Sequence, residues 1–227
     1  MQKIIFGIFA HPDDEAFCVA GTLLKEVAAG AELHLITLTA GENGMNPDDV
    51  PDLGETRLNE WRAAGKLIGA TSQQHFGYED GTLGNSDHVE ITNRIENHVR
   101  ELIAERSDTV VEFMSLDLNG LTGHIDHIVA ARSACLAFYR LKKAGLPMTR
   151  IRLACLAEED FPEVTTDFTL WQPGLPAKSI DETIDMRPEA EKVFEIMHAH
   201  RSQRSDASFW IDRLDNRVAI NHFIIKN

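Results

Sequence analysis

The apolar run of residues 3–9, followed directly by Ala10-His11-Pro12-Asp13-Asp14-Glu15, restricts the fold of this chain more than any other feature. The run has the length and continuity of a strand buried on both faces, and residues 16–29 have the pattern of a helix. The polar stretch therefore lies at a strand-to-helix turn, at the carboxyl end of a central strand. In open α/β sheets, this edge is where ligands bind.

Ordinary helix capping is the simpler explanation for the acidic residues of this turn. Pro12 suits a helix start, and carboxylates in the first turn interact favourably with the helix dipole. Capping does not, however, call for a histidine and two adjacent aspartates together. We therefore interpret the turn as part of a functional site.

Strand and helix patterns alternate over most of the chain, which favours a mainly parallel sheet with helices on both faces. The expected fold is an α/β, Rossmann-like three-layer αβα sandwich. Further strands are expected at residues 32–39, 73–76, 109–114 and 150–156, and further helices at 55–67, 88–105, 124–143 and 188–200. The apolar tail, residues 217–225, fits either a last strand or a covering segment.

A chain of 227 residues is long enough for one α/β domain with a sizeable core. We predict a single domain over residues 1–227. Residues 158–185 are less regular, because Pro162, Pro173 and Pro176 interrupt them, although 164–170 alternate like a strand. We expect this segment to take part in substrate selection.

Charge and cysteine content narrow the class of partner and the compartment. The formal net charge of −14 disfavours nucleic acids and anionic membranes, which both reward clustered Lys and Arg. The sequence has no signal-peptide pattern and no apolar stretch of the roughly 18 residues that a membrane span needs. The three cysteines are far apart in apolar contexts, as in reduced cytosolic proteins. We predict a cytoplasmic protein.

A second polar cluster, Gly123-His124-Ile125-Asp126-His127, follows the expected strand at 109–114. His124 and His127 share a helix face, although alone they fit solvated residues equally well. Both clusters follow buried strands and so lie at the same sheet edge. Nitrogen and carboxylate ligands without cysteine suit a catalytic zinc ion, which lowers the pKa of its water to about 7. Arg57 and Glu60, three residues apart, could form a plain surface ion pair.

With these motifs, the sequence resembles the PIG-L (LmbE-like) family of zinc-dependent N-acetylglucosaminyl deacetylases. Residues 10–15 and 123–127 carry the resemblance most specifically. Weaker matches lie at 57–60 with 67–69, at 77–81 and at 199–203, in the family's order. Ile125 stands where family members often have proline, which leaves both histidines in place.

The resemblance implies a role for each site residue. His11, Asp14 and His127 would hold one Zn²⁺ per chain, although affinity order alone does not select zinc over other divalent ions. Asp13 would be the general base, and His124, as an imidazolium, would stabilise the oxyanion and assist the leaving amine. Asp126 would orient His124. The residues implied to face the substrate are Arg57, Asp80 and His200.

The implied function is hydrolysis of an N-acetyl group on an amino sugar or glycoconjugate, a small-molecule substrate. An alternative keeps the amide chemistry but acts on a thiol conjugate or another small N-acyl amide. A nucleotide-binding Rossmann protein is disfavoured, because Gly-x-Gly-x-x-Gly is absent after the first strand. A non-catalytic metal sensor would have no need for Asp13. Some relatives form homo-oligomers, but no feature of this sequence fixes a symmetry.

Overall fold

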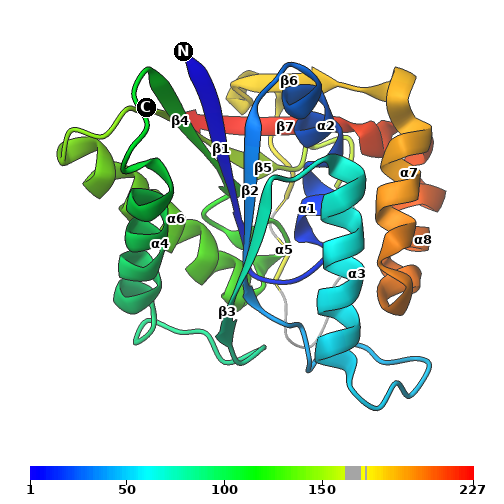
Figure 1. Cartoon of the computed structure of the whole chain (residues 1–227). Coiled ribbons are helices and arrows are strands. Elements are labelled where there is room, and N and C mark those ends of the chain that lie inside the picture. Colours follow the sequence, from blue (N-terminus) through cyan, green and yellow to red (C-terminus); the bar gives the residue numbers. More distant parts are fainter. Residues whose placement is uncertain (162–169, 172) are drawn as a thin grey trace.

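Within the described residues, seven strands form one sheet in the order β3-β2-β1-β4-β5-β7-β6 (Figure 1). The computed structural model describes residues 1–161, 170–171 and 173–227. The strands are β1 (Gln2–Phe9), β2 (Glu32–Thr39), β3 (Ser72–Tyr78), β4 (Thr109–Leu116), β5 (Met148–Cys155), β6 (Glu182–Asp185) and β7 (Ile220–Lys226).

Strands β1 to β5 are mutually parallel, with β1 at the centre between β2 and β4. Phe6 pairs in register with His34 of β2 and with Phe113 of β4. Strand β7 lies antiparallel between β5 and β6. Because β1 and β4 are parallel neighbours, the segments that follow them emerge at the same edge of the sheet.

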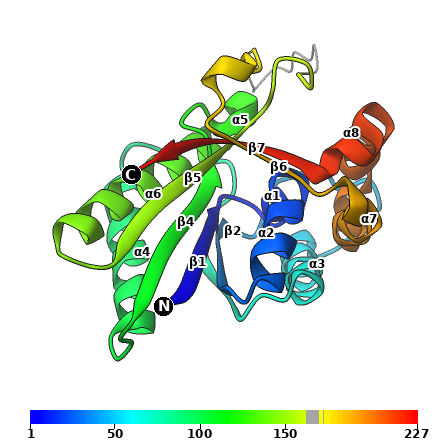
Figure 2. The same cartoon turned by 90° about the horizontal axis from the view of Figure 1, so that it is seen from above.

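Helices cover both faces of the sheet (Figure 2). The α-helices are α1 (Asp14–Cys18), α2 (Ala20–Ala28), α3 (Leu53–Ile68), α4 (His88–Ile103), α5 (Gly120–Gly123), α6 (Ile125–Lys143), α7 (Ala190–Ala199) and α8 (Arg204–Leu214). Short 3₁₀ turns span Ala177–Ser179, Arg187–Glu189, Arg201–Gln203 and Asp215–Ala219. Helices α4 and α6 form one layer, and α1, α2, α3, α7 and α8 lie on the other side. None of the helices in the described ranges is long and apolar enough to cross a membrane.

The residues of β1 alternate between the two hydrophobic cores. Ile4, Phe6 and Ile8 belong to the core under α4 and α6. Ile5 and Phe9 belong to the core under α2, α3 and α7. All five are at most 1% exposed, so β1 is buried on both faces, as its continuous apolar sequence predicts.

The three-layer fold predicted from the alternation of strands and helices is confirmed. The expected strand at 32–39 is present with those bounds, and the tail forms a strand, β7. The expected helix at 16–29 is two helices, because the chain leaves helical geometry at Val19. Strand β6 and helix α8 were not predicted. Residues 162–169, where the strand-like alternation was noted, lie outside the described residues, and the single-domain organisation stays a prediction.

Candidate active site

The first polar cluster lies where β1 turns into α1. Asp14 opens α1, and its Oδ2 accepts hydrogen bonds from the backbone N–H groups of Ala10 (3.0 Å) and His11 (3.1 Å). These bonds direct the other oxygen, Oδ1, to within 3.2 Å of His127 Nε2. Burial raises the pKa of Asp14, but His127 and His11 outweigh it and hold this pKa well below its usual range. The Asp14 carboxylate is therefore an oriented anion.

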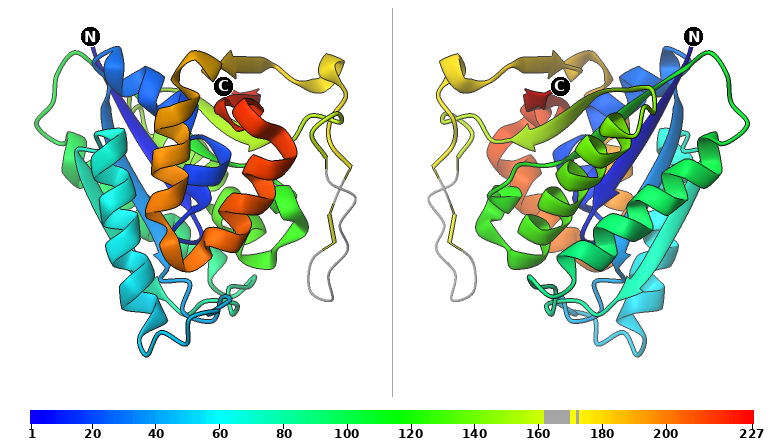
Figure 3. Two further views of the ribbon diagram at one scale, coloured as in Figure 1. Left: turned by 90° about the vertical axis from the view of Figure 1, so that its right-hand side faces the viewer. Right: turned by 90° about the vertical axis from the view of Figure 1, so that its left-hand side faces the viewer.

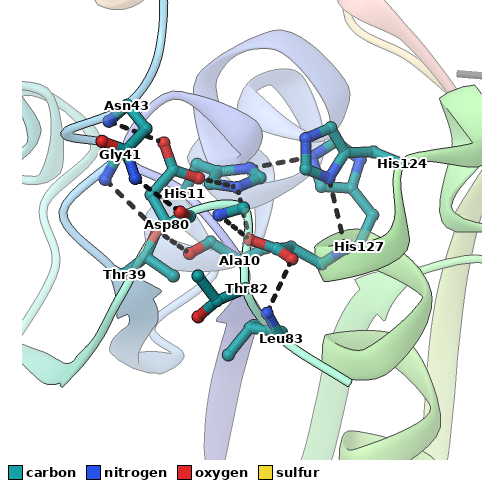
Figure 4. A network of polar contacts seen from close by, with 12 residues as sticks. Ala10, His11, Thr39, Gly41, Asn43, Asp80, Thr82, Leu83, His124 and His127 are labelled. Atoms are coloured by element: carbon teal, nitrogen blue, oxygen red, sulfur yellow. Dashed lines mark hydrogen bonds and ion pairs between the residues drawn. The ribbon is translucent and has the colours of Figure 1, made fainter. Parts of the chain in front are cut away.

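His127 comes from the first turn of α6 and points back toward β1. Its Nδ1 lies 3.0 Å from the carbonyl oxygen of Gly120, so Nδ1 donates and Nε2 offers a lone pair. This contact needs a glycine, because Gly120 has φ +72° and a Cβ there would lie 2.9 Å from the His127 Cβ. The His127 Nε2 lies 3.0 Å from His11 Nδ1 (Figure 4).

His11, Asp14 and His127 converge at this point. His11 Nδ1 is 4.0 Å from Asp14 Oδ2, whereas His127 Nε2 approaches the other oxygen, Oδ1, at 3.2 Å. Two nitrogen ligands on a tetrahedral zinc ion would lie roughly 3.3 Å apart, given Zn–N bonds of about 2.0–2.1 Å. His124 also offers a ring nitrogen within 4.8 Å of ligand atoms of His11 and His127.

Two further carboxylates lie behind His11. Its Nε2 is 3.0 Å from Asp80 Oδ1 and 3.4 Å from Asp126 Oδ2, although neither contact has hydrogen-bond geometry. Burial lowers the pKa of His11, but Asp126, Asp80 and Asp14 outweigh it and raise this pKa to about 10. Surplus negative charge around the histidines therefore favours a bound cation. Carboxylates commonly orient metal-binding histidines in this way.

Asp126 is placed differently from its expected role of orienting His124 with its carboxylate. That carboxylate accepts hydrogen bonds from the backbone N–H groups of Gly81 (2.7 Å) and Leu83 (3.2 Å), besides approaching His11. Its backbone N–H, in contrast, donates to His124 Nδ1 at 3.2 Å. Burial, together with His127 and His11, lowers the pKa of His124 to about 4. Because Nδ1 accepts this hydrogen bond, the ring proton of neutral His124 is on Nε2.

Asp13 is held by a buried arginine from α3. Arg57 Nη2 donates to Asp13 Oδ2 and to the carbonyl oxygen of Pro12, both at 2.9 Å. Its Nη1 donates to the carbonyl oxygen of Gly41 at 2.7 Å. Burial raises the pKa of Asp13 to about 6, against the lowering effect of the Arg57 guanidinium. Such a pKa suits a general base working near neutral pH.

The alternative of a surface ion pair between Arg57 and Glu60 is wrong. Arg57 is only 5% exposed and bonds the Asp13 turn. The Glu60 carboxylate instead accepts hydrogen bonds from the backbone N–H and hydroxyl of Ser202, at 2.9 and 2.6 Å. The two side chains therefore connect α3 to two different segments.

Asp13 has a strained backbone. Its φ of +119° and ψ of −24° lie where residues with a Cβ rarely occur. Such conformations cost on the order of 1–3 kcal/mol and persist only where the surrounding structure imposes them. Here the Arg57 bonds to Pro12 and Asp13 hold the turn. The strain brings Asp13 and Asp14 into the same site, although they are adjacent in sequence.

We expect Asp13→Gly to be more stable than Asp13→Ala by about 1 kcal/mol. Both variants lose the carboxylate and its ion pair with Arg57, but only glycine adopts this φ without strain. The measurement is urea unfolding of both variants in the presence of a chelator.

The same pair of substitutions at Glu191, an exposed residue of helix α7, is the control. There alanine should be the more stable by about 0.5–1 kcal/mol. An alanine at position 13 as stable as glycine would contradict the strain.

His200 lies behind the turn. Its Nε2 is 3.0 Å from Glu15 Oε1, and both side chains are fully buried. Glu15 Oε2 accepts a hydrogen bond from the Asp13 backbone N–H at 3.3 Å. Burial lowers the pKa of His200, but Glu15 and Asp13 outweigh it and raise this pKa. The structure thus places His200 behind the strained turn.

A cavity of about 540 Å³ opens over this site. Asp126 and His200 are absent from its wall. The predicted site residues in the wall are His11, Asp13, Asp14, Arg57, Asp80, His124 and His127. Of the three residues expected to face the substrate, Arg57 and Asp80 therefore line the cavity, and both already have protein partners.

Another part of the cavity wall comes from residues that the sequence analysis did not single out. Helix α8 contributes Asp206, Phe209, Trp210 and Leu214. Their spacing of three and four residues is a helical signal that would have revealed this face. From the less regular segment 158–185, the described residues Asp160 and Trp171 line the cavity.

Residues 6–138 match the family model PIG-L, described as GlcNAc-PI de-N-acetylase. The match covers more than half of the chain and includes both polar clusters. The chain therefore belongs to the PIG-L family.

Individual relatives agree with this assignment. The chain is 32% identical over 206 residues to 1D-myo-inositol 2-acetamido-2-deoxy-alpha-D-glucopyranoside deacetylase of Nakamurella multipartita, covering 78% of this chain and 68% of the relative. The fold of the present chain is similar to that of N,N'-diacetylchitobiose deacetylase from Pyrococcus horikoshii, with a TM-score of 0.67 and 18% identity. The match covers 99% of this chain and 84% of the deacetylase. The fold is also similar to that of GalB, the 4-carboxy-2-hydroxymuconate hydratase of Pseudomonas putida (TM-score 0.72, 16% identity, 100% and 97%). The fold alone thus does not fix the reaction.

Proposed function

We propose that this protein is a hydrolase that removes the N-acetyl group from an amino sugar or glycoconjugate, with one Zn²⁺ held by His11, Asp14 and His127. One observation carries the proposal. The buried Asp13 carboxylate, held by Arg57, adjoins the converging donor groups of His11, Asp14 and His127. A non-catalytic metal site would need the donor set alone.

Three side chains would carry the reaction beside the ion. When bound, zinc supplies positive charge that polarises the amide carbonyl and makes water more acidic. Asp13 accepts the proton of the attacking water, while Arg57 holds its Oδ2 in place. His124 presents Nε2–H to the carbonyl oxygen, because its Nδ1 is occupied by the Asp126 backbone N–H. Asp13, once protonated, passes its proton on to the leaving amine.

The family and the relatives' names favour an N-acetylated amino sugar over other amides. The Nakamurella relative, at 32% identity, is named as a deacetylase of an acetamido sugar joined to inositol. The alternative of a thiol conjugate or another small N-acyl amide keeps the same donor set and base. We also propose the cytoplasm as the compartment, supported by three free cysteines.

Amine release from a substrate panel tests the function. The zinc-loaded protein is incubated with N-acetylglucosamine, its methyl glycoside, diacetylchitobiose and an N-acetylated cysteine conjugate of glucosamine, and free amine and acetate are quantified. We expect amine and acetate in equal amounts from at least one N-acetyl sugar, and none after chelation. Release from the cysteine amide alone would favour the alternative, and release from none would refute the deacetylase.

A further inference from the structure

We propose that the α8 face made by Asp206 and Trp210, called here the α8 subsite, binds an uncharged, hydroxyl-bearing sugar ring of the substrate. The subsite would determine which amide-bearing molecules reach the metal centre. This inference rests on the proposed function for the chemistry at the N-acetyl group, but it concerns a different wall of the cavity.

The two side chains are placed to contact one ligand together. Asp206 and Trp210 are four residues apart, so they share a face of α8. Both line the same cavity as His11, Asp13 and His124. Helix α8 runs beside α7 (Figure 3).

The surroundings of the Asp206 carboxylate indicate what kind of group it could bind. Among the described residues, none forms a hydrogen bond or ion pair with it, although burial raises its pKa against the distant Arg57. An acidic residue in the first turn of a helix is commonly explained by the helix dipole. Asp206 is half-buried and lines the cavity, so its oxygens can be reached from the cavity, where the hydroxyl groups of a ligand can take the place of water. A ligand with hydroxyl donors would satisfy it.

Trp210 supplies the apolar half of the subsite. Its ring lies 6.0 Å from that of Trp171 and 5.3 Å from that of Phe209, centroid to centroid. These contacts hold the indole in place at the cavity wall. A sugar ring presents C–H groups on its face and hydroxyl groups at its edge. An aromatic surface next to a free carboxylate matches both.

The charges in the cavity wall favour an uncharged ring over a phosphorylated one. Among the described lining residues, the lysine and arginine cations are Arg57 and Arg217. Arg57 is paired with Asp13, and Arg217 with Glu159 and Asp160. The described part of the wall therefore offers no unpaired arginine to a phosphate, and Asp206 would repel it.

Calorimetric binding to the zinc-loaded Asp13→Asn variant tests the α8 subsite separately from turnover. The ligands are the methyl glycoside of N-acetylglucosamine and N-acetylglucosamine 1-phosphate. We expect the methyl glycoside to bind more tightly. Adding Asp206→Ala should raise its Kd roughly 10- to 100-fold, since hydrogen bonds to charged groups are the strong ones. Adding Trp210→Ala should raise it about 3- to 10-fold, and Trp210→Phe should recover part of the loss.

Asp212→Asn, on the exposed side of the same helix, is the matched control and should leave the Kd unchanged. Unfolding midpoints equal to the parent's show that the variants are folded. A methyl glycoside that does not bind, or whose Kd Asp206→Ala and Trp210→Ala leave unchanged, overturns the subsite. Tighter binding of the 1-phosphate overturns its preference for an uncharged ring.

The proposed function is tested separately, by measuring the amine that the wild-type protein releases from the substrates. Absent release with a Kd that depends on Asp206 refutes the deacetylase but supports the subsite. Normal amine release, together with a Kd that is unchanged by Asp206→Ala and Trp210→Ala, supports the deacetylase but refutes the subsite.

Discussion

Asp14→Ala is expected to empty the metal site and abolish turnover. The variant removes the carboxylate whose Oδ1 approaches His127 Nε2, and so one of three donor groups. We expect a loss of more than roughly 100-fold in metal affinity, because residues that merely orient metal ligands already contribute about 10- to 100-fold. Metal content per chain after dialysis, measured by atomic emission, gives the result directly, and amine release on the same preparation gives the activity.

Asp108→Asn is the matched control, since Asp108 is an exposed acid that precedes β4. It should keep about one ion per chain. His127→Ala should behave like Asp14→Ala. Metal content equal in wild type, Asp14→Ala and His127→Ala would show that the ion, if bound at all, uses other residues.

Asp13→Asn is expected to keep the metal and lose turnover by about 10²- to 10⁴-fold, the usual contribution of a general base. The amide oxygen of asparagine can still accept the hydrogen bond from Arg57, so the turn should keep its shape. What disappears is the group that accepts a proton near neutral pH. Metal content and kcat, measured on the same samples as Asp14→Ala, separate the two neighbouring aspartates.

The opposite pattern is equally informative. Loss of zinc in Asp13→Asn with retention in Asp14→Ala would mean that the two roles are exchanged. Wild-type kcat in Asp13→Asn would remove Asp13 from the mechanism altogether.

The sequence predicted the β1 half of the site well because the signals there are local. A continuous apolar run of this length favours a buried strand, and the polar residues after such a strand lie at the sheet edge. The convergence of His11 and His127 followed from two such strand ends. Neither inference needed knowledge of packing.

Spacing alone could not show where Arg57 and Glu60 point. Three residues apart on a helix, they can pair only if both lie on a free surface. In the fold, α3 is packed so that Arg57 reaches the Asp13 turn and Glu60 reaches Ser202. Both contacts join residues far apart in sequence, and such tertiary contacts leave no periodic trace.

Helix α8 escaped prediction for a related reason. Its apolar stripe, Ala207, Trp210, Ile211 and Leu214, has helical spacing but is set among Arg, Ser and Asp residues. Of these, Ala207 alone is fully buried, and Trp210 and Leu214 face the cavity. A helix that lines a cavity looks more polar in sequence than a core helix.

The position of α8 in the chain has an evolutionary consequence. The family match ends at residue 138, whereas α8 begins at Arg204 and is tied to the sheet by β7, which pairs with β5 and β6. The donor atoms and the α8 wall are thus encoded in separate stretches of the gene. Substitutions on the cavity face of α8 change the wall while leaving His11, Asp14 and His127 in place. Two proteins with the same polar motifs can therefore differ in substrate specificity, and the motifs alone do not identify the substrate.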